Sequence, residues 1–388
     1  PTRRSSDLSS NHTVARSLHI IVVLISKKIG IVESIVDQNG ELDDIRVKIN
    51  GELQRAYNYP KITGHINIGD EVLLNTTAVE LSLGTGGYHF VIANLNNLES
   101  NFTKGGHIMK LRYTPLQVKV DSVEEQESAY HKNIEEFSSL DNMPVVVGSL
   151  HSMLTPFVAS YKRLNPKKKL VYIMTDGAAL PIYLSKNVDT LKKKGLIDNT
   201  ITIGSAFGGD YECINIYTAL ITAKEVLKAD VVFVSMGPGI AGTGTKYGFT
   251  GIEQGPILDA VQKLGGMPIS IPRISFADQR ERHKGISHHS ITVLKEIVNV
   301  SVNLPICTYN EEQLCYIKEQ LRNNKLELKH NIVYINNENS KADLEYFELK
   351  VRSMGRNFDQ DKEFFEAAST AAYYLAEVCD DSRRENHK

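Results

Sequence analysis

The 388-residue sequence lacks the features that mark several common classes of protein. It has no tryptophan, and its four cysteines, at 213, 307, 315 and 379, are scattered without a C-x-x-C pair. This pattern argues against a disulfide framework or a C-x-x-C zinc site and indicates reduced thiols in a cytoplasmic protein. The formal net charge is only −2, so no excess of positive charge points to nucleic acid or to an anionic membrane as a partner.

The sequence also lacks an apolar run long enough to cross a membrane. The segment "LHIIVVLI" at 18–25 is far shorter than the roughly 20 residues of a membrane helix and lacks a small-residue cleavage site. Residues 1–8, "PTRRSSDL", are what one reading frame of a sequencing adapter encodes, and the first methionine is Met109. We therefore expect residues 1–24 to be a non-native or untranslated leader.

Residues 25–120 have the pattern of an all-β domain. Short, β-branched segments such as "IGIVESIV", "DIRVKI" and "HFVIANL" are punctuated by Asn39-Gly40 and Asn50-Gly51, dipeptides typical of two-residue hairpin turns. The pattern predicts a small β-barrel or sandwich. The acidic stretch "DSVEEQESAYHKNIEEF" that follows predicts a connector helix over 121–143.

From residue 144 the pattern changes to apolar runs that alternate with helical segments. The runs include "PVVVGS", "KLVYIMTDG", "TITIGSA" and "DVVFVSMG". Fully apolar strands alternating with helices are typical of a parallel sheet covered on both faces. We predict a doubly wound, mainly parallel, Rossmann-like α/β domain over 144–379 and a disordered tail over 380–388.

Polar side chains and glycines follow five consecutive predicted strands of this domain. The starts of the strands have no comparable set of functional-looking residues. In an open parallel sheet, ligands bind beyond the carboxyl ends of the strands. We therefore expect a ligand crevice at that edge. From the first three strand ends its candidate residues are Ser149, His151, Asp176, Gly209 and Asp210.

The fourth strand end, "SMGPGIAGTGTKYG" at 235–248, contains five glycines. It fits G-x-G-x-x-G, but the helix is delayed and no acidic residue follows at the spacing of a dinucleotide site; the Walker pattern fails by one residue. Successive glycine amides and threonine hydroxyls can still form an anion-binding concavity, and a plain turn is the alternative. The predicted anion cradle consists of Gly237, Gly239, Gly242, Thr243, Gly244 and Thr245.

The fifth strand end, "SFADQRERHKGISHH", is the densest polar cluster in the sequence. Arg280 and Arg282 can grip a phosphate or carboxylate, and His283 or His288 can move protons near neutral pH. Alternatively this segment could ligate a metal, although its H-x4-H-H spacing matches no established metal motif. The candidate metal ligands are Asp278, His283, His288 and His289.

Several of these stretches together resemble an uncharacterised bacterial family, the domain of unknown function 3866. The resembling stretches include "GDEVLLNTTAVELSLGTGGYHFV", "GSLHSML", "MTDGAALP", "MGPGIAGTGTKYGF" and "RERHKGISHH", and the match runs from about residue 27 to 377. The resemblance implies a cytosolic bacterial protein of this two-part layout. It brings no activity, substrate or catalytic assignment.

The residues themselves favour an enzyme that acts on a small anionic metabolite of the phosphorylated or nucleotide-like kind. Asp176 with His283 or His288 would supply acid and base, and the incomplete dinucleotide fingerprint favours a hydrolase or transferase over an oxidoreductase. The alternative is a non-catalytic ligand-binding or regulatory protein. We expect no nucleic-acid or membrane partner, while homo-oligomers stay open and the sequence identifies no cofactor.

Overall fold

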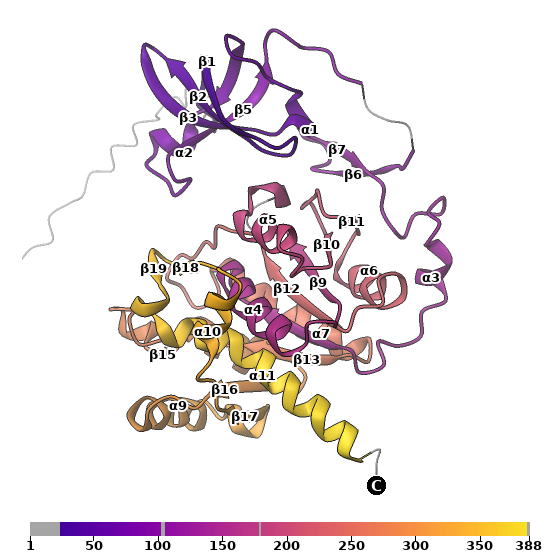
Figure 1. Cartoon of the computed structure of the whole chain (residues 1–388), viewed down its shortest axis with the longest axis vertical. Helices are drawn as coiled ribbons and strands as arrows, with labels where there is room; N and C mark the ends of the chain where they lie inside the picture. Colours follow the sequence, from indigo (N-terminus) through magenta and orange to yellow (C-terminus); the bar gives the residue numbers. More distant parts are fainter. Residues whose placement is uncertain (1–23, 102–104, 178–179, 386–388) are drawn as a thin grey trace, which may run out of the picture. The chain divides into compact units, whose positions relative to one another are not determined.

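The computed structural model describes residues 24–101, 105–177 and 180–385, which divide after Asn101 into two compact units (Figure 1). The predicted leader lies outside the described residues except for its last position. No helix among the described residues is long and apolar enough to span a membrane.

The first unit is a closed five-stranded barrel. Its strands follow one another around the barrel in the order β1-β2-β3-β5-β4; β3 and β5 run parallel and the other pairs antiparallel. The strands are β1 (Lys27–Gln38), β2 (Asp43–Ile49), β3 (Glu52–Asn58), β4 (Glu71–Asn75) and β5 (Tyr88–Asn94), with short helices α1 (Pro60–Thr63) and α2 (Thr77–Glu80) between them.

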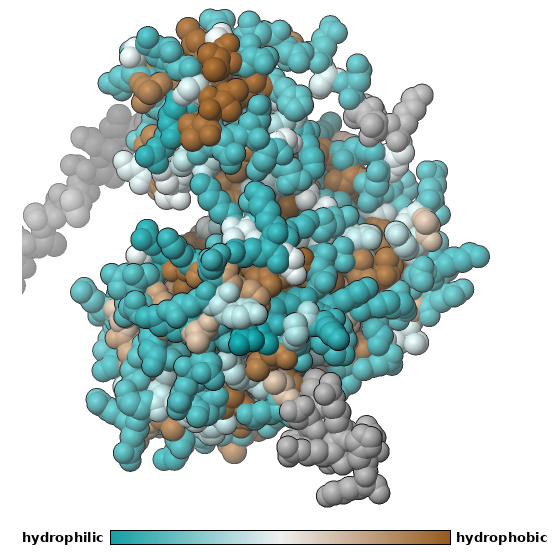
Figure 2. All heavy atoms as spheres, in the orientation of Figure 1, coloured by the Kyte–Doolittle hydropathy of each residue, from teal (hydrophilic) through white to brown (hydrophobic). Residues whose placement is uncertain are grey.

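Alternation along the strands explains how the barrel fills its core. On β2, Ile45, Val47 and Ile49 point inward and are at most 2% exposed. The predicted turn at Asn50-Gly51 joins β2 to β3 with both residues at positive φ, as a two-residue hairpin requires. Apolar side chains also gather on the visible face of the barrel (Figure 2), and on β1 Ile29 is 56% exposed.

The second unit is built on an eight-stranded, all-parallel sheet in the order β11-β10-β9-β12-β8-β13-β16-β17. The strands are β8 (Pro144–Gly148), β9 (Leu170–Thr175), β10 (Asn199–Thr202), β11 (Tyr211–Glu212), β12 (Val231–Met236), β13 (Met267–Ile271), β16 (Asn303–Cys307) and β17 (Asn331–Ile335). Small antiparallel pairs accompany it: β6 (Ile108–Lys110) with β7 (Val118–Val120), β14 (Ile274–Ser275) with β15 (Gly285–Ile286), and β18 (Arg352–Ser353) with β19 (Arg356–Asn357).

Helices cover both faces of the sheet (Figure 1). Val145 and Val147 of β8 belong to one apolar cluster and Val146 to the other, so the two faces have separate cores. One face packs against α4 (Leu154–Leu164), α5 (Lys186–Lys193), α10 (Ser340–Tyr346) and α11 (Lys362–Glu385); the other packs against α6 (Ile216–Ile221), α7 (Gln254–Lys263) and α9 (Glu311–Asn323).

The direction of chain travel reverses beside β8. From β8 the chain continues to β9 on one side, whereas from β12 it passes to β13 on the other side of β8. Adjacent strands whose connections leave in opposite directions open a crevice beyond their carboxyl ends. This topology places the crevice between the ends of β8, β12 and β13.

The predicted connector helix over 121–143 is wrong in extent. The only helix the structure describes there is α3 (His131–Glu135). The acidic side chains before it make tertiary hydrogen bonds instead: Glu124 accepts from the backbone N–H of Ile214 and Glu125 from that of His107. The predicted disordered tail is also too long, because α11 continues to Glu385.

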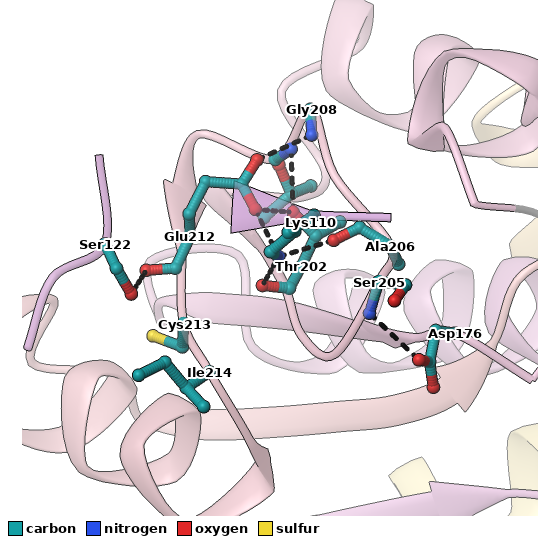
Figure 3. Close-up of polar contacts among 12 residues, drawn as sticks. Lys110, Ser122, Asp176, Thr202, Ser205, Ala206, Gly208, Glu212, Cys213 and Ile214 are labelled. Atoms are coloured by element: carbon teal, nitrogen blue, oxygen red, sulfur yellow. Dashed lines mark hydrogen bonds and ion pairs between the residues drawn. The ribbon is translucent and has the colours of Figure 1, made fainter. Parts of the chain in front are cut away.

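The β6–β7 hairpin belongs by its contacts to the second unit, although the sequence places it in the all-β domain. Lys110 of β6 is 2% exposed, and its ammonium donates to Glu212 of β11 at 2.6 Å. It also donates to the backbone carbonyls of Thr202 at 3.1 Å and Ala206 at 2.5 Å (Figure 3). A buried charge needs such partners, so this lysine anchors the hairpin to the edge of the sheet.

Candidate functional site

A pocket of about 210 Å³ lies at the topological switch point of the sheet. It draws on chain segments that are far apart in sequence. The residues that line it are Leu150 after β8; Ile240, Ala241, Gly242 and Gly244 after β12; Arg273 after β13; Arg280, Arg282, His283 and His289; and Met354 in the β18–β19 turn. The glycine-rich loop and the arginine- and histidine-rich segment therefore meet at one site.

Close packing joins these two segments. A Cβ added at Gly242 would lie 3.7 Å from Cε1 of His289, and one at Gly244 would lie 3.9 Å from Nη2 of Arg282. The ring of Phe249, just beyond the loop, stacks on His289 with centroids 4.0 Å apart. Glycine at 244 also adopts a φ of +79°, which other residues rarely adopt.

Arginines dominate the charge of the pocket. Arg273 is buried and donates to Asp278 at 2.9 Å, and Arg280 binds the same carboxylate through two bonds of 2.9 and 2.8 Å. These arginines, Arg280 first, hold the pKa of Asp278 well below its usual range. Arg282 forms no ion pair with a carboxylate among the described residues, so one positive charge at the pocket is left uncompensated.

Three imidazoles lie together beside these arginines. Nδ1 of His283 is 2.6 Å from Nη1 of Arg273 and 2.8 Å from Oγ of Ser287. A guanidinium can only donate, and Nε2 also faces one, Nε of Arg282 at 3.5 Å. The much shorter contact with Arg273 makes Nδ1 the acceptor and leaves the proton of the neutral ring on Nε2. Burial, reinforced by Arg273, lowers the pKa of His283 to about 3.

The neighbouring histidines are also neutral at physiological pH. Burial and the charge of His288 lower the pKa of His289 to about 4, and burial with Arg282 lowers the pKa of His288. The Nε2 atoms of both rings are buried without a hydrogen-bond partner in the described part of the chain. One nitrogen from each ring of His283, His288 and His289 lies within 4.8 Å of the others.

Asp176 reaches the same edge of the sheet but does not line this pocket. It follows β9, which β12 separates from β8, and its Oδ2 accepts from the backbone N–H of Ser205 at 2.9 Å (Figure 3). Next to it, Glu253 accepts from Oγ1 of Thr175 at 2.5 Å. Burial raises the pKa of Glu253 to about 7, and the charge of Asp176 adds to the rise. The structure thus has a carboxylate pair apart from the arginines.

Other predicted site residues have structural partners. His151 is buried and hydrogen-bonded to Ser185 Oγ at 2.7 Å, and burial lowers its pKa to about 4. Asp210 accepts from Thr200 and pairs with Lys192 at the β10–β11 edge.

Close approach explains Gly209, since a Cβ there would lie 2.9 Å from the backbone nitrogen of Thr202. Ser149 lines a smaller cavity that adjoins the pocket.

The predicted anion cradle contributes only part of its residues. Thr243 and Thr245 hydrogen-bond to each other at 2.9 Å, and both also bind the backbone of Gly248. Their hydroxyls therefore stabilise the loop itself. Gly237 is buried directly after β12 and Gly239 is exposed at a φ of +106°; neither lines the pocket.

Comparison with known proteins identifies the family. The model of the family described as a protein of unknown function, DUF3866, matches residues 55–372. The chain belongs to this family. No curated protein matches the sequence significantly.

The DUF3866 match spans every segment of the pocket. The family match assigns no activity, so the proposed function rests on the geometry of the site.

Sequence reasoning missed two residues that the structure makes prominent. Arg273 lies inside the apolar stretch "ISIPRIS", and a single charge there was the available signal. Glu253 lies in "FTGIEQGP" at the start of a helix. A pattern built on strand ends therefore did not include it.

Proposed function

We propose that the pocket binds a small anionic metabolite of the phosphorylated kind and that the protein is a hydrolase or transferase. The observation that carries the proposal is the uncompensated guanidinium of Arg282 beside Arg273 and Arg280. Two of these charges share one carboxylate, so the group keeps an excess positive charge that an anion would neutralise.

The donors in the pocket suit an oxyanion. Nε2–H of His283 is a donor in the tautomer that Arg273 imposes, and Arg282 adds charge-assisted donors. We also take the sheet to be doubly wound and Rossmann-like. The reversal of strand order beside β8, and a pocket beyond those strand ends, support that assignment.

Strongly shifted imidazole pKa values in a pocket favour an enzyme, because catalytic sites perturb their titratable groups. The position of Asp176 outside the pocket favours the alternative, a ligand-binding protein without a positioned carboxylate base. The free thiols of Cys213, Cys307 and Cys315 support the proposed cytoplasmic location.

Phosphate binding tests the proposal directly. Calorimetry of the full chain with inorganic phosphate should show binding that Arg282→Ala weakens by about 10- to 150-fold, the equivalent of about 1.5–3 kcal/mol for a charge-assisted hydrogen bond. Arg282→Lys should recover only part of the affinity, because lysine lacks the bidentate fork.

The matched control is Arg322→Ala, which removes an exposed arginine of α9 and the same net charge. Equal phosphate affinity in Arg282→Ala, Arg322→Ala and the unmodified chain would contradict the arginine grip.

A further inference from the structure

Anion binding uses Nε2–H of His283 but does not explain His288 and His289. Each of these two rings has an Nε2 atom that is buried without a hydrogen-bond partner in the described chain. A buried polar atom without a partner costs about 1–3 kcal/mol. Two such atoms, on rings whose centroids lie 4.9 and 5.3 Å from that of a third imidazole, call for a ligand.

We infer that His283, His288 and His289 form a binding site for a divalent transition-metal ion such as Zn²⁺ at the side of the pocket. One nitrogen from each ring lies within 4.8 Å of the others, and imidazole nitrogen suits zinc. Three protein ligands leave a coordination position open, as in catalytic zinc sites. This deepens the proposed function, and only the placing of the anion at the open position rests on that function.

Local structure brings the three rings together. His288 and His289 are the first two residues of α8 (His288–Thr292), and their ring centroids lie 4.0 Å apart. The β14–β15 hairpin carries His283 to within 4.9 Å of His288 and 5.3 Å of His289, centroid to centroid. A tetrahedral zinc ion holds its nitrogens roughly 3.4 Å apart, so the rings would draw in by about 1 Å on binding.

Metal binding requires a proton shift on His283. Nε2 carries the proton while Arg273 donates to Nδ1, and Nε of Arg282, 3.5 Å from Nε2, has to turn away before an ion binds there. When Nε2 binds the ion, its proton leaves and Nδ1 takes one up; Nδ1–H then donates to Oγ of Ser287, 2.8 Å away. Arg273 gives up this one bond and keeps Asp278 at 2.9 Å. Ser287 would thus orient a metal-binding histidine through its second nitrogen.

The charges around the site favour binding of a metal together with an anion. Asp278, a candidate ligand from the sequence, is occupied by Arg273 and Arg280 and does not belong to the ligand set. Arg282 adds positive charge that repels a cation. An anion bound between Arg282 and the open coordination position would remove that repulsion, so metal and anion should bind cooperatively.

Zinc binding by the full chain tests the inference. The protein is stripped with a chelator and titrated with Zn²⁺ against a competing chromophoric chelator. We expect about one ion per chain, and an affinity that falls more than about 100-fold in His288→Ala and in His289→Ala, since loss of a second-shell partner alone costs about 10- to 100-fold. His65→Ala, on the barrel and exposed, is the control and should keep full affinity.

Further measurements separate ligation from folding. Circular dichroism and melting of each metal-free variant show whether it folds, and His289→Gln replaces a variant that does not. Ser287→Ala should weaken zinc by about 10- to 100-fold while Ser287→Thr, which keeps the hydroxyl, restores it. Co²⁺ bound by the three histidines should show the intense visible absorption of a four-coordinate ion.

The outcomes separate this inference from the proposed function. Zinc affinity that is the same in the His288→Ala/His289→Ala variant as in the unmodified chain, or binding far below one ion per chain, overturns the metal site. If metal-free protein still binds phosphate through Arg282, the anion pocket stands without it. Zinc bound by the histidines with no phosphate affinity would leave the metal site standing and refute the proposed function.

Discussion

Replacing Lys110 by alanine tests how the β6–β7 hairpin is held to the second unit. The substitution removes a 2%-exposed ammonium that donates to Glu212, whose side chain is 11% exposed, and to the carbonyls of the buried residues Thr202 and Ala206. Breaking a buried ion pair by removing one partner costs about 3–5 kcal/mol. Glu212 keeps bonds from Thr202 Oγ1 at 2.7 Å and Gly208 N–H at 2.6 Å, so we expect the lower part of that range.

The loss should depend on pH in a defined direction. Burial already raises the pKa of Glu212 above 4.5, and losing the charge of Lys110 raises it further. A carboxyl group whose pKa is higher in the folded than in the unfolded protein ionises more readily in the unfolded chain. The free energy of unfolding therefore falls as pH rises past the pKa of the unfolded state. The deficit of Lys110→Ala should therefore be small below about pH 4.5 and grow toward neutral pH.

Two assays register the effect. Urea denaturation followed by circular dichroism reports the free energy of unfolding, and hydrogen exchange reports local opening of residues 105–121 if the hairpin detaches first. Lys119→Ala is the control in the same hairpin, since Lys119 pairs with the 74%-exposed Asp121, and it should cost less than about 1 kcal/mol. A loss under about 1 kcal/mol in both assays for Lys110→Ala would refute the reasoning.

Two other carboxyl groups give predictions with opposite signs. Because burial raises the pKa of Glu253 to about 7 from 4.5, the unmodified protein should lose about 2–3 kcal/mol of stability between those pH values. Glu253→Gln should flatten that part of the melting profile and stabilise the protein at pH 8; an unchanged slope would contradict the assignment. Asp278 has its pKa held far below 3.8 by Arg280 and Arg273, so its stabilisation is present above about pH 4 and is lost as pH falls. Asp278→Asn should cost about 3–5 kcal/mol at pH 7, because Arg273 is left buried without a carboxylate, and a melting temperature equal to the unmodified protein's would count against it.

The sequence predicted the two-part fold and the meeting of its two most distinctive segments. Apolar runs alternating with helices indicate a parallel sheet, and parallel strands bring their carboxyl ends to one edge, so the loop at 240–244 and the segment at 280–289 had to emerge on the same side. What sequence could not supply is strand order. Asp176 follows a strand as directly as the glycine loop does, but β12 lies between β9 and β8 and separates it from the pocket.

Local patterns misled where tertiary contacts decide the structure. The acidic stretch before residue 143 has helical propensity, but Glu124 and Glu125 accept hydrogen bonds from the backbone N–H groups of Ile214 and His107, outside that stretch. His151 follows a strand end as a ligand-binding residue would, but its side chain turns into the core to Ser185. The direction a side chain takes from a strand end depends on neighbours that the sequence does not reveal.

The position of β8 at the centre of the sheet has a consequence for biosynthesis. Both strands that flank it, β12 and β13, come from residues 231–271, long after β8 itself has left the ribosome. Its apolar residues 145–147 therefore have no strand partner until the ribosome has synthesised residues 231–271. Such delayed, non-local pairing slows folding and exposes the chain to aggregation, so this family should depend on chaperones during translation more than a protein whose neighbouring strands are consecutive.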